Sequence, residues 1–302
     1  MKTYLDCIPC FFRQALETAK LSGASPRAQR CVLNKLAGIL SAFSLTATPP
    51  EMGQIIYRMV SSVTGKKDPY AQIKAESNRK ALKLYPQLKK MIVRSRDRLG
   101  AAVRLAIAGN IIDYGVKNSL NVERELKKML SAENRAIHQE NRKLYQCEQF
   151  RRALRKAETV LILGDNAGET VFDRLLIEEI KREDPQKRIS YAVKAGPTIN
   201  DALEEDARFC GIDRVANIIS SGIAAPGTIL SLCSRNFVRV FHQADMVISK
   251  GQGNFESLSD SPRPVFFFFM AKCPVVAEHV GCQMRDIILR CGRKNLTREG
   301  SK

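Results

Sequence analysis

The chain lacks long apolar segments, which excludes a membrane-spanning protein. Its longest strongly apolar run begins at Val265 and stops before Lys272, whereas a transmembrane helix needs about 20 apolar residues. Aromatic residues make up only 7% of the sequence. Because no RNP, KH or zinc-knuckle motif accompanies them, recognition of RNA by base stacking is not favoured. The three histidines stand alone in the sequence, without an H-E-x-x-H spacing.

Motifs of several common enzyme classes are also missing. There is no G-x-x-x-x-G-K-[ST] phosphate loop, no G-x-G-x-x-G after the first predicted strand, and no paired-aspartate signature of the haloacid-dehalogenase phosphatases. We therefore do not expect an ordinary NTPase or a dinucleotide-binding enzyme. No Ser-His-Asp or Cys-His arrangement is legible. A methyltransferase would need a glycine-rich cofactor loop, which residues 164–169 imitate only in part.

The first residues do not resemble an export signal. Asp6 and two early cysteines interrupt the stretch that would have to be apolar. The nine cysteines are an odd number, which argues for reduced thiols rather than a disulfide framework. We therefore predict a cytoplasmic protein that does not associate with membranes.

Acidic residues are scarce relative to basic ones. The 31 Asp and Glu face 49 Lys and Arg, which gives a formal net charge of +18. Such a field attracts anions, namely nucleic acid, acidic membranes or phosphorylated metabolites, without choosing among them. Most basic runs are typical of solvated helix faces. A non-catalytic, basic protein that binds RNA or nucleotides is the alternative that this charge keeps open.

The first half of the chain has the pattern of helices, because apolar residues recur at three-and-four spacing. One helix is expected to begin at Asp68-Pro69-Tyr70, where the missing N–H of proline is harmless, and to end at Tyr85-Pro86. Further helices are expected over residues 87–99, 101–112 and 123–155.

From Glu158 onward, short aliphatic runs alternate with helical patterns. Strands are predicted at residues 159–163, 189–193, 215–219, 246–249 and 265–270, with a further element at 228–232. This alternation implies right-handed crossovers and a sheet covered on both faces. The predicted fold class is α/β, a Rossmann-like, mostly parallel sheet with helices on both faces, preceded by an all-helical N-terminal region. We expect that region over residues 1–155, the α/β core over 156–295 and a tail over 296–302, with fraying from residue 290.

Polar residues gather in the turns after the predicted strands, where ligands bind in open parallel sheets. Asp165 and Asn166 follow the first strand, Asp201 follows the second, and Lys250 and Lys272 follow later ones. Carboxylate and amide oxygens suit Mg²⁺ or Mn²⁺, while glycine N–H groups and lysines suit phosphate. Either acidic turn alone could be a helix cap. Their coincidence favours a divalent metal at Asp165 and Asn166 and phosphoryl chemistry on a small molecule.

Motifs along nearly the whole chain match one family in order and spacing. They are the turn 164–169, Pro197 with Asn200-Asp201, residues 250–254, Lys272, Cys7-Ile8-Pro9-Cys10, Asp68-Pro69-Tyr70 with Lys74 and Ser77-Asn78, and residues 109–113. The chain resembles the metal-dependent damage-control phosphatases, formerly a domain of unknown function, in their prokaryotic branch with an N-terminal cysteine pair. The resemblance implies an α/β phosphatase core that uses Mn, Mg, Co or Ni. It also implies hydrolysis of small phosphate monoesters, such as damaged or surplus sugar phosphates or cofactor intermediates.

The resemblance assigns roles by position. Asp165, Asn166 and Asp201 match the metal ligands, and Asp165 and Lys272 match catalytic residues. The positions that match substrate contacts are Asn254, Lys250, Gly168, Glu169, Asn110 and Asp113. Ile223-Ala224 stand where the resemblance predicts a polar or acidic residue, a difference that bears on substrate range rather than on metal binding.

Two chemical questions stay open at this point. Phosphorus could be attacked by a metal-activated water or by Asp165 itself, which would form an aspartyl-phosphate. Water is favoured, because a metal-bound carboxylate is a weakened nucleophile. Cys7 and Cys10 could be buried structural thiols, a redox pair, or half of a zinc site that needs a distant partner. The natural substrate and the oligomeric state are not predicted.

Overall fold

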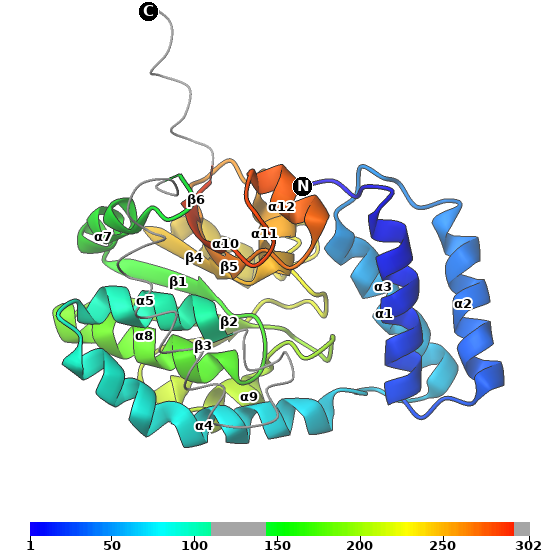
Figure 1. The fold of residues 1–302 in the computed structure, drawn as a ribbon, viewed down its shortest axis with the longest axis horizontal. Helices are drawn as coiled ribbons and strands as arrows, with labels where there is room; N and C mark the ends of the chain where they lie inside the picture. The colour runs from blue at the N-terminus through cyan, green and yellow to red at the C-terminus, as the bar shows by residue number, and fades with distance from the viewer. Residues whose placement is uncertain (110–142, 293–302) are drawn as a thin grey trace, which may run out of the picture.

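The computed structural model describes residues 1–109 and 143–292. In chain order, the elements are α1 Cys7–Leu21, α2 Pro26–Leu40, α3 Pro49–Thr64, α4 Ala71–Arg94, α5 Arg98–Ala108, α7 Cys147–Lys156, β1 Thr159–Leu163, α8 Glu169–Glu183, β2 Arg188–Val193, α9 Glu204–Phe209, η3 Ile212–Arg214, β3 Asn217–Ser220, α10 Arg235–Gln243, β4 Met246–Lys250, α11 Gln252–Leu258, β5 Phe266–Met270, α12 Pro274–Val280 and β6 Ile287–Cys291. Figure 1 shows a central sheet between helices, with a group of N-terminal helices at one end.

The six strands of the described residues form one sheet in the order β3-β2-β1-β4-β5-β6. Strands β1 to β5 are parallel, and β6 pairs antiparallel with β5. The chain runs outward from β1 to β3 on one side and from β4 to β6 on the other. The neighbours β1 and β4 therefore flank the point where the order reverses, and in such sheets ligands bind outside the carboxyl ends of the strands at this point.

Alternating side chains of each strand supply two cores, one on each face of the sheet. Val160 and Ile162 pack with residues of α4, α5, α7 and α8. Leu161 and Leu163 pack on the other face with residues of α10, α11 and α12. Because both faces are buried, β1 has a continuous apolar sequence rather than an alternating one. The predicted fold class, a mostly parallel sheet with helices on both faces, is confirmed.

Helices α1, α2 and α3, which we call the cap, have a hydrophobic core of their own that includes Phe11, Leu36 and Ile56. The cap meets the α/β part where α3 packs against α11. There Gly53 lies so close to Pro226 that a Cβ on Gly53 would overlap the proline ring. Figure 1 shows the cap beyond the ends of the strands, on the side toward which β1 points.

The predicted helix end at Pro86 is wrong. Helix α4 continues through Pro86 to Arg94. The proline removes only one helical hydrogen bond, and this loss is offset because Ala81 and Leu88 pack both halves of the helix into the core. The predicted helix over residues 87–99 is therefore the end of α4. A new helix, α5, begins at Arg98.

Other differences concern the edges of the sheet. Tyr145 forms a bridge to Leu289, so α7 begins only at Cys147. Residues 228–232 form turns, and α10 is the helix between β3 and β4. Arg290 and Cys291 belong to β6 rather than to a fraying end, because β6 pairs along all of β5.

The predicted boundary at residue 155 stays a prediction. Helices α4, α5 and α7 precede it but pack on the sheet, whereas α1 to α3 have a separate core. Residues 110–142 of the predicted helices, and the predicted tail over 296–302, lie outside the described residues. In the parts of the chain that the structure describes, no helix is both long and apolar enough to cross a bilayer.

Candidate active site

The turn after β1 is buried and held from several sides. The side chains of Asp165, Asn166 and Glu169 are all buried. The Asn166 amide nitrogen donates to Asp165 Oδ2 at 3.0 Å and to Glu169 Oε1 at 2.7 Å. Gly168 has φ +83° and packs on Ser77 of α4, so that a side chain there would be both strained and crowded. The turn therefore presents three polar side chains at the switch point with little freedom to move.

Backbone hydrogen bonds bring the turn after β2 onto the turn after β1. Asn166 and Asp201 form an isolated antiparallel bridge, and the Ala202 N–H donates to the Asp165 carbonyl at 2.8 Å. Asp201 is buried, with 2% of its surface exposed. The structure thus brings together the three predicted metal ligands, Asp165, Asn166 and Asp201.

Lys250, at the end of β4, is buried in an acidic environment. Its Nζ lies 2.5 Å from Asp173 Oδ1 and 3.7 Å from Glu169 Oε2. Tyr191 donates its phenolic O–H to the other Asp173 oxygen at 2.8 Å. Burial lowers the pKa of Lys250, but the two carboxylates outweigh burial and raise it. Lys250 is therefore firmly charged, and Asp173 holds it in place beneath the β1 turn.

Gly251 allows the β4 turn to approach the β1 turn. Its φ is +79°, and a Cβ at this position would collide with the Asp165 carboxylate. Only glycine combines this left-handed conformation with the absence of a side chain. The sequence Lys250-Gly251 therefore places a cation and a close backbone approach on the two sides of Asp165.

Asn254 of α11 uses its amide to tie the strand-end turns together. Its nitrogen donates to the carbonyls of Lys250 at 2.8 Å and Gly164 at 3.2 Å. Its oxygen accepts from Thr228 at 2.8 Å and from the Lys194 ammonium at 3.3 Å. The predicted contact between Asn254 and substrate stays a prediction, and in the described structure this amide positions its neighbours.

Two further lysines act on the carboxylates. Lys194 Nζ lies 3.6 Å from Asp201 Oδ2. The Lys272 backbone N–H donates to the Gln252 side chain at 2.8 Å. The Lys272 ammonium is near enough to lower the pKa values of Asp165, Glu169 and Asp201 by its charge. Lys272 thus lies at the predicted site, while Lys194 is an addition to it.

Burial nevertheless dominates the electrostatics of the site. It raises the pKa of Asp165, that of Glu169 to about 8, and that of Asp201 to about 8. Mutual repulsion of these carboxylates adds to the shift, and the lysines oppose it. A carboxylate whose charge is disfavoured in this way becomes stable when another cation is placed beside it. The described site is therefore short of positive charge.

The donor set fits a hard divalent cation. Asp201 Oδ2 and Glu169 Oε2 are buried and lack a hydrogen-bond donor within the described structure, an uncommon state for buried oxygens. Within residues 1–109 and 143–292, no three His, Cys, Asp or Glu side chains converge as a metal cluster. The predicted set instead consists of two carboxylates and an amide, and Mg²⁺ or Mn²⁺ usually takes few protein ligands and keeps several waters.

Cys7 and Cys10 lie in the first turn of α1. Both cysteines lie near enough to Cys273 for their thiolate charges to interact with it. Cys273 accepts a hydrogen bond from Gln252 at 3.6 Å. Burial raises the pKa values of Cys7 and Cys273, which favours neutral thiols over the thiolates that zinc requires. A zinc or redox role for the cysteine pair stays a prediction.

Some predicted features lie elsewhere. Asn110 and Asp113, predicted as substrate contacts, lie outside the described residues. The α4 side chains Arg79, Lys80 and Lys83 are exposed. Exposure agrees with the interpretation of this basic run as a solvated helix face. RNA binding stays an untested alternative.

Several residues of the site were not assigned a role from the sequence, although Asn78 belongs to a motif that the family shares. Asp173 follows Glu169 by one helical turn, and this i, i+4 spacing in α8 is a signal that could have found it. Lys194 directly follows β2, as Lys272 follows β5, so repetition of lysine at strand ends was a second signal. Asn78 of α4 accepts from the Gly168 N–H at 2.7 Å and donates to Asp206 at 2.7 Å. No local pattern indicates these two contacts.

The fold and the site define an α/β protein with an acidic, lysine-flanked site at the switch point of its sheet. Residues 3–288 match the damage-control phosphatase ARMT1-like domain. The chain therefore belongs to this family, as the resemblance predicted. The branch with an N-terminal cysteine pair stays a prediction.

Individual relatives agree with this assignment over almost their full length. The chain is 33% identical to a damage-control phosphatase of Pyrococcus horikoshii, covering 93% of this chain and 94% of the relative. It is 32% identical to a damage-control phosphatase of Archaeoglobus fulgidus, covering 96% and 99%. A crystal structure of the Pyrococcus horikoshii protein, described as a DUF89 family protein, superimposes with a TM-score of 0.85 over 96% of this chain and 99% of that chain. These relatives support a phosphatase.

Proposed function

We propose that this protein is a divalent-metal-dependent phosphatase that hydrolyses small phosphate monoesters. The observation that carries the proposal is the buried pair Asp165 and Asp201, held together by the backbone at the switch point and flanked by lysines. Membership in the damage-control phosphatase family supports the reaction class. Asp165, Asp201 and the Asn166 amide oxygen would hold the cation.

The charges of the site favour this combination of cation and substrate. Four carboxylates (Asp165, Glu169, Asp173 and Asp201) face three lysines (Lys194, Lys250 and Lys272) among the described residues. With all four carboxylates ionised, the cluster carries one negative charge, and a divalent cation would turn it positive. A phosphate dianion would then be attracted more strongly than by the protein alone.

The cation, when bound, would supply Lewis acidity toward a phosphate oxygen. The chain itself does the rest. Lys272 would stabilise charge on the equatorial oxygens of the transferred group. Lys194 would do the same from the β2 side, where Asn254 holds its ammonium. Lys250, held by Asp173, keeps the Glu169 side chain in position.

We propose direct attack by water rather than by Asp165. Asp165 already accepts a hydrogen bond from Asn166, and a carboxylate that also holds a cation is a weak nucleophile. Acid-quenching the enzyme during turnover tests this point. Recovery of phosphate covalently bound to Asp165 would show that the carboxylate attacks.

The central test is Asp165→Ala, assayed against a panel of phosphate monoesters with Mg²⁺, Mn²⁺, Co²⁺ and Ni²⁺. We expect kcat/KM to fall by about 10³-fold or more, because a metal ligand is lost. Calorimetric titration with Mn²⁺ should show that binding is lost as well. Asp213→Ala, which removes an exposed aspartate, is the matched control. Wild-type turnover by the Asp165 variant would mean that the site is wrongly assigned.

A further inference from the structure

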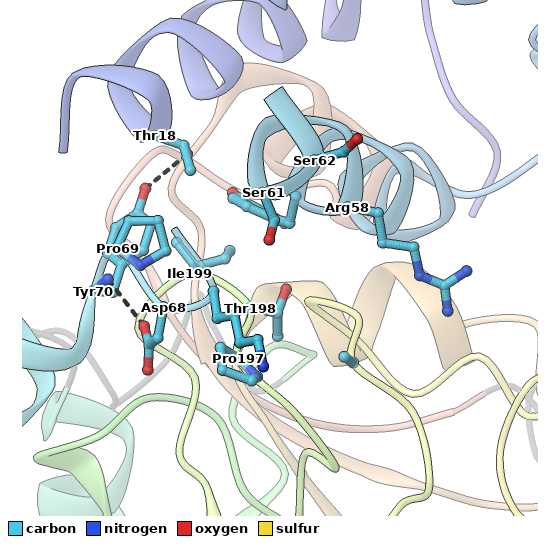
Figure 2. Close-up of a pocket in the computed structure, with 13 residues that line it drawn as sticks. Thr18, Arg58, Ser61, Ser62, Asp68, Pro69, Tyr70, Pro197, Thr198 and Ile199 are labelled. Carbon is cyan, nitrogen blue, oxygen red and sulfur yellow. Dashed lines mark hydrogen bonds between the residues drawn. The ribbon is translucent and has the colours of Figure 1, made fainter. Parts of the chain in front are cut away.

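A cavity of about 340 Å³ lies between the cap and the turn after β2. Figure 2 shows its walls: α3 contributes Ser61 and Ser62, the segment before α4 contributes Asp68 to Tyr70, and the β2 turn contributes Pro197 to Ile199. Small-molecule sites measure about 300–1,000 Å³. This cavity is at the small end of that range, which suits a compact metabolite rather than a macromolecule.

The cavity adjoins the candidate metal site. Its wall residue Thr198 is three positions before Asp201, and the Asp201 N–H donates to the Thr198 carbonyl at 3.1 Å. Between them, Ile199 has φ +41°, a conformation rare for a β-branched residue and typical of functional loops. On the opposite wall, burial and then the nearby charges of Tyr70 and Asp201 raise the pKa of Tyr57. A molecule whose phosphate lies at Asp201 would extend into this cavity.

The lining is rich in hydroxyl groups, from Thr18, Tyr57, Ser61, Ser62, Tyr70 and Thr198. Thr198 Oγ1 is buried and has no hydrogen-bond partner within the described structure. Such a group is costly unless a ligand satisfies it. Figure 2 shows the Thr198 side chain below α3, on the side of the cavity that faces Ser61. Thr18 and Tyr70 already hydrogen-bond to each other, and Tyr57 donates to Gln14. A ligand with hydroxyl groups of its own would satisfy Thr198 and could bond to the serines of α3.

The rim of the cavity is positively charged. Arg58 and Lys67 are exposed there, and neither forms an ion pair with a residue that the structure describes. The Asp68 carboxylate is neutralised by Lys74, whose Nζ lies 2.9 Å away. Ala224 lines the wall at the position where an acidic or polar residue was expected from the family. The two cations of the rim would therefore attract an anion, and the one carboxylate among the described lining residues is already paired with a lysine.

We propose that this cavity binds the alcohol part of the phosphate ester and selects polyhydroxylated substrates that carry a second anionic group. The inference rests on the proposed function. The reacting phosphate lies at Asp165 and Asp201, and the hydroxyl groups of the substrate meet Thr198 and the serines of α3. The second anion, a carboxylate or a second phosphate, pairs with Arg58 and Lys67 at the rim.

The test compares phosphate esters of six-carbon polyhydroxylated compounds that differ in whether they carry a second anionic group. Glucose 6-phosphate carries no second anion, 6-phosphogluconate carries a carboxylate, and fructose 1,6-bisphosphate carries a second phosphate. The wild-type enzyme should prefer one of the two esters that carry a second anion over glucose 6-phosphate by about tenfold or more in kcat/KM. Which of them is preferred identifies the second anion.

Variants then locate the preference. Arg58→Gln and Lys67→Gln should each reduce it about five- to tenfold, mainly through KM, because a charge-assisted contact is lost. Lys66→Gln removes a neighbouring exposed charge outside the cavity and should leave the preference unchanged. Thr198→Val should weaken all polyol esters relative to p-nitrophenyl phosphate, and Thr198→Ser should restore them.

Binding without turnover separates this inference from the proposed function. In metal-free buffer, calorimetry should show that wild type binds 6-phosphogluconate or the bisphosphate more tightly than glucose 6-phosphate, and that Arg58→Gln abolishes the difference. Hydrolysis of p-nitrophenyl phosphate together with no such discrimination, in binding or in turnover, would overturn the inference alone. Discrimination in binding without hydrolysis of any ester would overturn the phosphatase and leave the cavity assignment standing.

Discussion

Replacement of Lys250 by methionine tests how the buried charges of the site are held. The Lys250 side chain has 1% of its surface exposed and that of its partner Asp173 has 0%, with 2.5 Å between Nζ and Oδ1. Without the ammonium, the one hydrogen-bond donor that Asp173 keeps among the described residues is the Tyr191 hydroxyl, at 2.8 Å. Glu169 loses its nearest lysine, at 3.7 Å. Breaking a buried pair by removal of one partner costs about 3–5 kcal/mol. This is a large share of the about 5–15 kcal/mol that stabilises a typical domain.

Two further variants serve as controls for the predicted loss of stability. Lys89→Met breaks an ion pair of similar length, 2.6 Å to Glu178, but the Lys89 side chain is 45% exposed. Its loss should therefore cost less than about 1 kcal/mol. The double variant Lys250→Met/Asp173→Asn also removes the charge of Asp173 and keeps an acceptor for Tyr191. It should recover at least half of the stability that Lys250→Met loses.

The free energy of unfolding is measured by urea titration with circular dichroism, in EDTA, and the transitions are compared at equal slope. Either of two results would refute the reasoning: equal losses for the Lys250 and Lys89 variants, or no recovery in the double variant. The double variant also tests the predicted role of Lys250 in substrate binding. If stability returns but kcat/KM does not, the ammonium acts on the substrate as well as on the fold.

Two further predictions concern pH and backbone. Because burial raises the pKa values of Glu169 and Asp201 to about 8, the folded metal-free protein holds protons that the unfolded chain releases. The stability that these bound protons contribute is complete below the ordinary carboxyl pKa and is lost as pH rises through about 8. The Tm measured in EDTA should therefore fall between pH 5 and 9, and saturating Mn²⁺ should reverse this trend. A flat metal-free profile would contradict it. Gly251→Ala should abolish Mn²⁺ binding and lower kcat/KM about 100-fold or more, because its Cβ would collide with Asp165. Gly281→Ala has a similar φ, +76°, with open space around it, and losses of the same size there would show that strain alone is responsible.

Part of the fold could be predicted because its signals are local. Continuous aliphatic runs mark strands buried on both faces, and this pattern located β1, β2, β4 and β5 closely. The order of the strands has no local signal, since it depends on which crossover packs on which face. Strand β6 escaped notice for a related reason. Its pairing with β5 is tertiary, and the polar residues around it looked like the start of a disordered end.

The candidate site divides in the same way. Asp165 and Asn166 were recognisable because their acidic turn, which alone could be a helix cap, coincided with similar turns at successive strand ends. Their closeness to Asp201 followed from the rule that parallel strands end at one edge. What holds them could not be predicted. Asn78 reaches the Gly168 turn from α4, about 90 positions earlier in the chain, and only the assembled packing of α4 on α8 creates this contact.

The proposed roles are divided between the strand ends, which hold the carboxylates, and the cap, which selects the substrate. Carboxylates that must stay close together against their repulsion need a rigid, buried support, and the strand ends provide it through backbone bonds such as that from Ala202 to Asp165. Selection among alcohols needs only neutral hydrogen bonds and rim charges, which exposed side chains such as Arg58 and Ser62 on α3 supply without strain. The hydrogen bonds described above for the β1 and β2 turns come from elements other than α3, so substitutions of the exposed side chains of α3 remove none of them. The fold therefore lets the choice of substrate vary while the groups proposed to carry out hydrolysis stay in place.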